Sequence, residues 1–234
     1  MKSVFFDLGG TLLVMRRDRV LHRVLTDEGY EVGLKAIRTS YEHAEPGWLE
    51  HWATQHVSGD EAVEAYRQLN FMVIDDLGIT KSEDESKRLS LLARDRREEI
   101  SRGVPLELYP DVEPVLSRLI ALGFTLALVS NAPPDTHQTV VELGLLKYIN
   151  HIVISGIAGW SKPSPEIFRI ALSMASAQPQ ETVHVGDIYA SDVLGARNAG
   201  ITPVLLDRDG TSTARDCLKI KSLSELPGIL AGLG

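Results

Sequence analysis

Apolar positions follow different spacings in different parts of the chain. Across residues 16–103, apolar residues recur at helical spacing among many charges, and no convincing strand appears. Elsewhere, short apolar runs alternate with helical stretches, and one such run opens the chain at residues 2–6. The pattern predicts an α/β unit at residues 1–14 and 105–234, interrupted by an all-helical insert at residues 15–104.

The α/β part is predicted to form a parallel sheet. Its strand candidates are short, apolar throughout and separated by helical segments, which is typical of parallel strands covered on both faces. Besides residues 2–6, the candidates are residues 125–129, 151–154, 182–185, 202–206 and 218–220. We therefore expect a three-layer α/β/α sandwich with the N-terminal strand in its centre.

The insert is predicted to contain several amphipathic helices in succession. The first ends at the Gly29 turn, and its apolar face consists of Val20, Leu21, Val24 and Leu25. A break between two later helices is expected at the turn-forming sequence Glu45-Pro46-Gly47. The further helices are expected at about residues 33–45, 48–57, 60–77 and 81–102.

Length and composition are those of an ordinary globular protein. The 234 residues, 44% of them hydrophobic, suffice for a core domain with a smaller accessory domain. The longest uncharged apolar stretch, Leu119 to Val129, is shorter than the roughly 20 residues of a membrane span, and the N-terminus enters a strand rather than a signal sequence. We expect a cytoplasmic protein with no membrane partner. The single cysteine, Cys217, excludes an internal disulfide.

The charge of the chain limits its partners. A formal net charge of -8, without a long basic run, argues against nucleic-acid binding, which depends on neutralising backbone phosphates. If the substrate is an anion, it has to be held by local positive groups and a metal ion.

Polar side chains follow four of the predicted strands. Ligand sites of open parallel sheets lie beyond the carboxyl ends of the strands, so these residues are candidates for a site. They are Asp7, Ser130 with Asn131, Lys162, and Asp187 with Asp192 five residues later.

In their order along the chain, these residues resemble the four motifs of the haloacid dehalogenase superfamily. The matching segments are Asp7 to Leu12, Ser130, Lys162 and the sequence Gly186-Asp187-Ile188-Tyr189-Ala190-Ser191-Asp192, and the insert occupies the place of that family's small helical (C1-type) cap. The resemblance implies a Rossmann-like core, Mg²⁺ as cofactor, a small phosphorylated metabolite as substrate and an aspartyl-enzyme intermediate.

The resemblance also implies roles for individual residues. Asp7 would be the nucleophile, and an attack by a carboxylate on a phosphoryl group divides hydrolysis into two steps. Mg²⁺ would be bound directly by Asp7, Asp187 and the carbonyl of Gly9, with Asp192 as a ligand through water or as an anchor of the direct ligands. The remaining residues would bind the phosphoryl group, with Ser130 and Lys162 also catalytic: Ser130, Asn131, Lys162, Gly10 and Thr11.

Gly9 departs from the phosphatase pattern. Phosphatases of this superfamily have an aspartate there, which protonates the leaving oxygen and later activates water; such assistance is typically worth about 10²- to 10⁴-fold. Three alternatives stay open: a slower phosphatase, a phosphate-binding module with negligible turnover, and an enzyme of the phosphonate-cleaving or dehalogenase type.

A side chain of the insert could replace the missing acid and base. The sequence around Pro46 is rich in groups that transfer protons, and histidine titrates in the useful range; the candidates are Tyr41, His43, Glu45, His51 and His56. The identity of the substrate, and whether the protein is a monomer or a homodimer, stay open.

Overall fold

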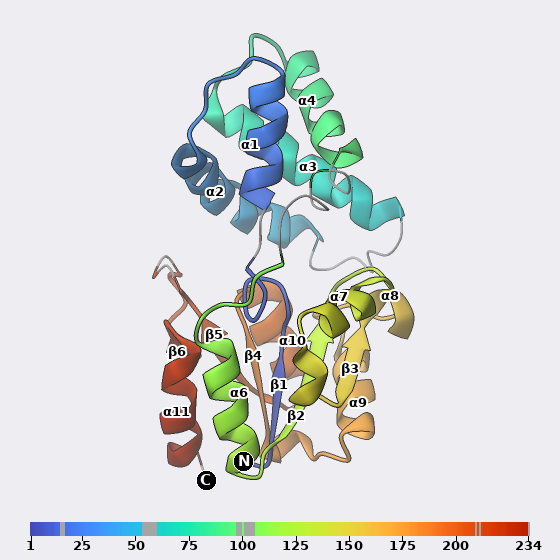
Figure 1. The fold of residues 1–234 in the computed structure, drawn as a ribbon, viewed down its shortest axis with the longest axis vertical. Helices are drawn as coiled ribbons and strands as arrows, with labels where there is room; N and C mark the ends of the chain where they lie inside the picture. The colour runs from blue at the N-terminus through green and yellow to red at the C-terminus, as the bar shows by residue number, and fades with distance from the viewer. Residues whose placement is uncertain are drawn as a thin grey trace. The chain divides into compact units, whose positions relative to one another are not determined.

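The computed structural model describes residues 1–14, 17–52, 60–96, 100, 106–208, 210 and 212–233. By its internal contacts the chain divides into two compact units (Figure 1). One consists of Met1–Val14 and Leu106–Gly234 and is called the α/β unit here; the other, Met15–Pro105, is called the helical unit.

The α/β unit is built on a six-stranded sheet in which every pair of neighbouring strands is parallel. The strands are β1 Ser3–Phe6, β2 Thr125–Ser130, β3 His151–Ile154, β4 Thr182–Gly186, β5 Thr202–Leu206 and β6 Leu218–Ile220. Their order across the sheet is β3-β2-β1-β4-β5-β6, so β1 lies between β2 and β4. The predicted strands and the α/β fold class are confirmed.

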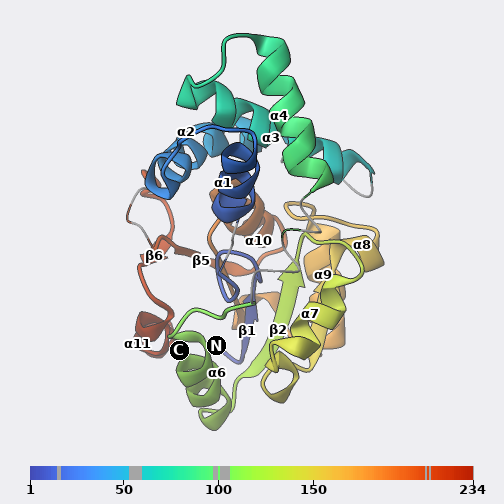
Figure 2. The same ribbon diagram turned by 45° about the horizontal axis from the view of Figure 1, so that its top comes forward.

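Helices cover both faces of this sheet (Figures 1 and 2). The helices are α6 Val112–Ala121, α7 Thr136–Glu142, α8 Ser155–Ala158, α9 Pro165–Met174, α10 Leu194–Asn198 and α11 Leu226–Gly232. Short 3-10 turns lie at Leu145–Lys147, Pro179–Glu181 and Leu223–Glu225, and a π-helical turn lies at Tyr189–Val193.

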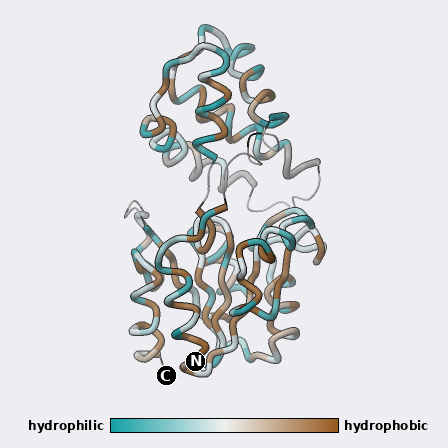
Figure 3. Tube along the Cα trace, in the orientation of Figure 1, coloured by the Kyte–Doolittle hydropathy of each residue, from teal (hydrophilic) through white to brown (hydrophobic). Residues whose placement is uncertain are grey.

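The alternation of side chains along β1 shows how the two faces are filled. Val4 and Phe6 point to the face covered by α6, α7 and α11, whereas Phe5 points to the face covered by α9 and α10. All three are fully buried, because a strand in the middle of a parallel sheet contacts helices on both sides. Figure 3 shows the result as a sheet of hydrophobic residues inside more polar helices. β1 therefore ends in a rigid setting.

In the described part of the helical unit, four long helices enclose a core of their own. They are α1 Arg17–Asp27, α2 Leu34–Trp52, α3 Asp60–Leu77 and α4 Glu83–Asp95. The core includes Leu21, Leu25, Ile37, Leu69, Ile74 and Leu89, each at most 1% exposed. Among the described helices of the protein, none combines the length and the apolar character needed to cross a membrane.

The predicted break at Glu45-Pro46-Gly47 is wrong. α2 continues through these residues to Trp52. A proline in a helix removes one backbone hydrogen bond, but it can kink a helix without ending it. The α3 boundaries agree with the prediction, while the end of the helix expected at residues 48–57 lies outside the described residues.

Replacing Phe168 tests the packing beneath the site. Phe168 is fully buried on α9, in the cluster that contains Phe5. Phe168→Ala is expected to lower the free energy of unfolding by about 3–5 kcal/mol because it leaves a cavity. Met174→Ala, on the same helix at a position 47% exposed, should change it by less than about 0.5 kcal/mol. Chemical denaturation measures both, and equal effects would contradict the assignment of the core.

Candidate active site

Asp7 lies directly after the central strand, at the carboxyl edge of the sheet. Its backbone N–H donates to the carbonyl of Val185 in β4 at 2.9 Å, which extends the strand pairing by one residue. The residue is only 6% exposed. The carboxylate is thus held at the edge where ligands of parallel sheets bind.

The ammonium group of Lys162 joins two of the predicted carboxylates. Lys162 Nζ lies 2.7 Å from Asp7 Oδ1 and 2.6 Å from Asp192 Oδ1. All three side chains are buried: the exposed fraction is 2% for Lys162, 8% for Asp7 and 1% for Asp192. A buried ion pair is stable only when its geometry is good and the remaining polar atoms are hydrogen-bonded. Lys162 therefore belongs to the site and is not a surface lysine.

Asp192 is anchored on both carboxylate oxygens. Oδ1 also lies 3.0 Å from His184 Nε2, and Oδ2 accepts the N–H of Ile188 at 3.0 Å. The residue lies in the π-helical turn after β4, a geometry often found at functional sites. Gly186 makes room for it, because a Cβ there would lie 2.1 Å from the Asp192 carboxyl carbon.

Asp187 lies close to the glycine turn after β1. The hydroxyl of Thr11 donates to Asp187 Oδ1 at 3.1 Å. Gly10 has a φ of +80°, and a Cβ at this position would lie 2.1 Å from Asp187 Oδ2. Gly10 is thus required both for its left-handed backbone and for the space beside Asp187.

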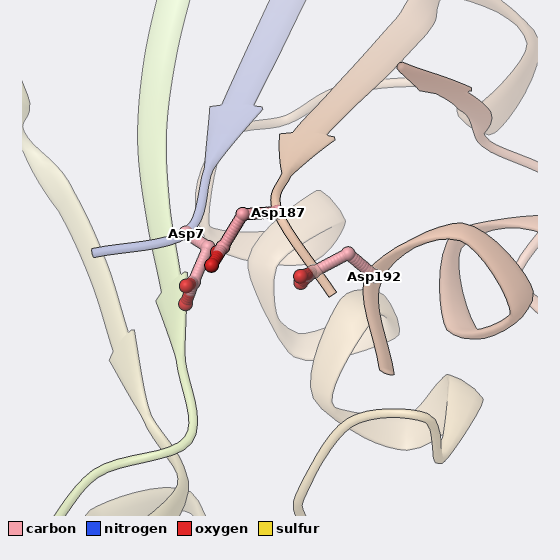
Figure 4. Close-up of side chains that lie close together, drawn as sticks. All are labelled: Asp7, Asp187 and Asp192. Carbon is pink, nitrogen blue, oxygen red and sulfur yellow. The ribbon is translucent and has the colours of Figure 1, made fainter. Parts of the chain in front are cut away.

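The three aspartates form an acidic cluster that could hold a divalent cation. One ligand atom from each of Asp7, Asp187 and Asp192 lies within 4.8 Å of the others, and Figure 4 shows the carboxylates gathered beyond the ends of two strands. Mg²⁺ prefers carboxylate oxygens and needs one or two of them. Since both oxygens of Asp192 already accept hydrogen bonds, Asp7 and Asp187 fit best as direct ligands and Asp192 as an anchor.

These buried charged groups shift one another's pKa values. Burial raises the pKa of Asp7, and the ammonium of Lys162 offsets part of that rise. For Asp192 burial acts in the same direction, but Lys162 and His184 outweigh it and hold the pKa well below its usual range. Burial would lower the pKa of Lys162, yet Asp192 and Asp7 raise it. Lys162 and Asp192 therefore stay charged at neutral pH.

His184, a residue of a predicted strand and thus expected in the core or near the site, lies beside the acidic cluster and is fully buried. It lies in β4 opposite Phe5, and burial lowers the pKa of its imidazole. The neutral ring packs edge-on against Phe168, with ring centroids 4.9 Å apart. The feature of the sequence that indicates this role is a polar residue within a buried strand, five residues before the start of the π-helical turn.

The loop after β2 braces Lys162. Asn131 Nδ2 donates to the carbonyl of Lys162 at 2.8 Å, and the N–H of Lys162 donates to Asn131 Oδ1 at 2.7 Å. Ser155 Oγ bonds both the N–H and the carbonyl of Ala132. Ser130, 4% exposed, ends β2 beside Ile154. The amide of Asn131, a predicted substrate-binding group, is thus engaged with the backbone of Lys162.

The candidate acids and bases of the helical unit lie in varied settings. Tyr41 is buried and donates its hydroxyl to Asn70, which makes it part of the core of that unit. His43 Nδ1 lies 3.2 Å from Asp76 Oδ2 on an exposed face. His56 and the side chains of Glu45 and His51 lie outside the described residues.

Fold and site together define a class. A parallel α/β sheet with aspartates and a buried lysine at its carboxyl edge is typical of a Rossmann-like protein with an acidic site that could hold a cation. The chain belongs to the haloacid dehalogenase-like hydrolase family, whose model matches residues 1–200.

Curated relatives match part of the chain. A phosphoserine phosphatase of Thermus thermophilus is 40% identical over 102 residues, which are 43% of this chain and 41% of the relative. A glyceraldehyde 3-phosphate phosphatase of Methanopyrus kandleri is 36% identical over 104 residues, 44% of this chain and 45% of the relative. The chain thus matches less than half the length of either relative.

Solved structures match the whole chain. A 2-haloacid dehalogenase from Pseudomonas syringae is similar with a TM-score of 0.61 and 25% identity, covering 100% of both chains. A putative hydrolase of the family from Bacillus subtilis, bound to magnesium, has a TM-score of 0.70 at 17% identity and covers 98% of both chains. The second likeness shows the fold alone.

Removing the ammonium of Lys162 tests the charge network. Lys162→Met leaves Asp7 and Asp192 buried without their counter-charge, and the free energy of unfolding in metal-free buffer at neutral pH should fall by about 3–5 kcal/mol. In this variant the carboxylates have pKa values above those of the unfolded chain, so protonation favours the folded state. The deficit relative to the unchanged protein should therefore shrink as the pH falls from about 7 to about 5. Denaturation curves at several pH values measure it, and a deficit independent of pH would contradict the network.

Proposed function

We propose that the protein is a phosphatase-type hydrolase that transfers the phosphoryl group of a small phosphorylated metabolite to Asp7. The observation that carries the proposal is the buried ammonium of Lys162 between Asp7 and Asp192, beside the Asp187 carboxylate. Carboxylates gathered around one cation at a sheet edge are suited to binding and attacking an anion, because the positive charges reduce the repulsion between nucleophile and substrate.

In the first step an oxygen of the Asp7 carboxylate attacks phosphorus. A phosphorus–oxygen bond forms, the bond to the leaving oxygen breaks, and the phosphoryl group becomes attached to Asp7. In the second step water attacks phosphorus, the bond between phosphorus and the Asp7 oxygen breaks, and its electron pair returns to the Asp7 carboxylate. Hydrogen phosphate leaves with the oxygen and one proton of the water, and the other proton passes to solvent. The ammonium of Lys162, already 2.7 Å from Asp7 Oδ1, favours the ionised carboxylate that both steps require.

Other residues of the site hold the reacting groups. Ser130, the last residue of β2, would donate a hydrogen bond to a phosphoryl oxygen. Asp187 and Asp7, with the carbonyl of Gly9, would bind Mg²⁺, and Asp192 would stay in place as the anchor of Lys162. When bound, Mg²⁺ supplies positive charge that neutralises the phosphoryl oxygens and orients them. The helical unit would act as a cap that excludes water and selects the substrate.

The relatives support the phosphoryl chemistry. The curated relatives described above are a phosphoserine phosphatase and a glyceraldehyde 3-phosphate phosphatase, so small phosphorylated metabolites are the first substrates to try. Ester hydrolysis is expected to be slower with Gly9 than with an aspartate at this position, because glycine has no group to protonate the leaving oxygen.

A second candidate is carbon–halogen cleavage, which needs no proton on the leaving group. It is favoured by Gly9 and by the likeness over the whole chain to a 2-haloacid dehalogenase. However, the acidic pair Asp187 and Asp192 fits a metal-dependent reaction better than carbon–halogen cleavage.

A third candidate function is that of a phosphate-binding module with negligible turnover. A fourth is the cleavage of a phosphonate.

Asp7→Asn should abolish phosphate release. The expected result for the unchanged protein is Mg²⁺-dependent release from phosphoserine, glyceraldehyde 3-phosphate or p-nitrophenyl phosphate, lost on chelation and lost in the variant because an amide is a poor nucleophile. A colorimetric phosphate assay measures it. Turnover that persists in Asp7→Asn would contradict the proposal, and halide release from 2-chloropropionate that ignores Mg²⁺ would favour the dehalogenase.

Gly9→Asp should raise turnover of esters with poor leaving groups. The backbone of Gly9, unlike that of Gly10, is not left-handed, so an aspartate can adopt it. A gain of up to about 10²- to 10⁴-fold is expected for an alkyl ester such as phosphoserine. The gain should be much smaller for p-nitrophenyl phosphate, whose leaving group needs little protonation. Equal gains on both substrates, or none, would show that Gly9 does not limit proton transfer.

A further inference from the structure

Arg208 joins the loop after β5 to the loop that follows Asp7. Its side chain is 16% exposed, and its two terminal nitrogens lie 2.9 and 3.1 Å from the carboxylate oxygens of Asp111. Nη2 also donates to the backbone carbonyl of Thr11 at 2.8 Å. The guanidinium carbon lies 3.8 Å from the centre of the Tyr109 ring. Hydrogen bonds therefore fix the guanidinium group of Arg208 within its plane, and the Tyr109 ring packs against its flat face.

Asp111 fixes the orientation of the Arg208 guanidinium group. Besides the two bonds from Arg208, its carboxylate accepts the hydroxyl of Ser222 at 2.8 Å and the N–H of Leu223 at 2.9 Å. Burial would raise the pKa of Asp111, but the bonds from Arg208 and Ser222 outweigh it and lower the pKa. Asp111 thus presents a charged, four-fold bonded acceptor that keeps Arg208 in one orientation.

Thr11 connects Arg208 to the acidic cluster. Its carbonyl accepts from Arg208, and its hydroxyl donates to Asp187 Oδ1 at 3.1 Å. The residue is completely buried. Because one residue makes both contacts, a change in the position of its backbone would also move the hydroxyl that orients Asp187.

Two backbone hydrogen bonds of the α/β unit lie beside the points where the chain crosses between the units. The N–H of Tyr109 donates to the carbonyl of Leu12 at 3.0 Å, and the N–H of Val14 donates to the carbonyl of Glu107 at 2.8 Å. These residues flank the points where the chain leaves and re-enters the α/β unit. Arg208, stacked on Tyr109, therefore braces this junction as well as the Thr11 loop.

We propose that Arg208 is a positioning residue of the site, which acts through the backbone of Thr11 to orient the Asp187 carboxylate. The inference rests on the proposed function in one respect, namely that Asp187 binds Mg²⁺. The role requires an arginine, because a lysine ammonium offers neither the planar fork that serves Asp111 and Thr11 together nor a flat face for Tyr109.

Amide hydrogen exchange of the metal-free protein tests the contact itself. In Arg208→Met and Arg208→Lys, the amides of Leu12, Leu13 and Val14 should exchange about tenfold faster than in the unchanged protein, because their loop has lost its brace. Arg169→Met is the matched control: it removes an exposed arginine–carboxylate pair, Arg169 with Glu166, from the same unit, and should leave these amides unchanged. Unchanged exchange in Arg208→Met would overturn the inference.

Calorimetric titration with Mg²⁺ tests the consequence for Asp187. Thr11→Val should weaken binding about tenfold or more, and Arg208→Met about 3- to 10-fold, as expected for groups that orient a metal ligand from outside. In the Thr11→Val background, Arg208→Met should have less than about a twofold further effect, because the path through the hydroxyl is gone. A merely structural role would lower the melting temperature without this dependence on Thr11.

The outcomes separate the two proposals. If the unchanged protein binds Mg²⁺ and Arg208→Met binds it equally well, the positioning role fails and the proposed function stands. If the unchanged protein does not bind Mg²⁺ while the exchange of the Thr11 loop rises in Arg208→Met, the brace is established and the metal-dependent function fails. If Thr11→Val and Arg208→Met raise the Mg²⁺ dissociation constant additively, Arg208 does not act through Thr11, and the proposal is overturned.

Discussion

The buried ammonium of Lys162 is the group on which the arrangement of the site depends. Three carboxylates lie within a few ångströms of one another, and a protein interior does not tolerate such a group of charges unless they are compensated. Lys162 compensates two of them directly. Three carboxylates against one ammonium leave two negative charges, which is the charge that one divalent cation balances. The same residue thus stabilises the folded site and leaves it suited to bind Mg²⁺.

Much of this arrangement could be predicted from the sequence. The strands are short apolar runs, and parallel strands present their carboxyl ends at one edge, so Asp7, Ser130 and Asp187 had to lie near each other. The break expected at Pro46 failed because local turn propensity competes with the continuing helix, and the helix prevails there. Local signals are weakest where tertiary contacts decide the outcome.

The contacts that support the site could not be predicted in the same way. Lys162 and Asp7 are 155 positions apart, Arg208 and Thr11 are 197 apart, and no spacing pattern encodes such pairs. The pairing of Asn131 with the backbone of Lys162 depends on how two loops cross. A polar residue after a strand indicates a candidate, but its partner is set by the fold. Sequence patterns therefore indicated the candidate residues of the site better than the contacts that hold them.

In the proposed reaction, Gly9 separates the placement of the nucleophile Asp7 from the protonation of the leaving group. The structure holds the Asp7 carboxylate beside the ammonium of Lys162 and near Asp187, whereas Gly9 has no group that could protonate a leaving oxygen. The most direct test of this account is to quench the protein during turnover of acetyl phosphate with Mg²⁺ and to map the phosphorylated residue by mass spectrometry. The account predicts a transient phosphoryl group on the peptide that contains Asp7, and on that residue within it. Phosphate release with no phosphorylation of Asp7 at any quench time, or with the group on another residue, would contradict it.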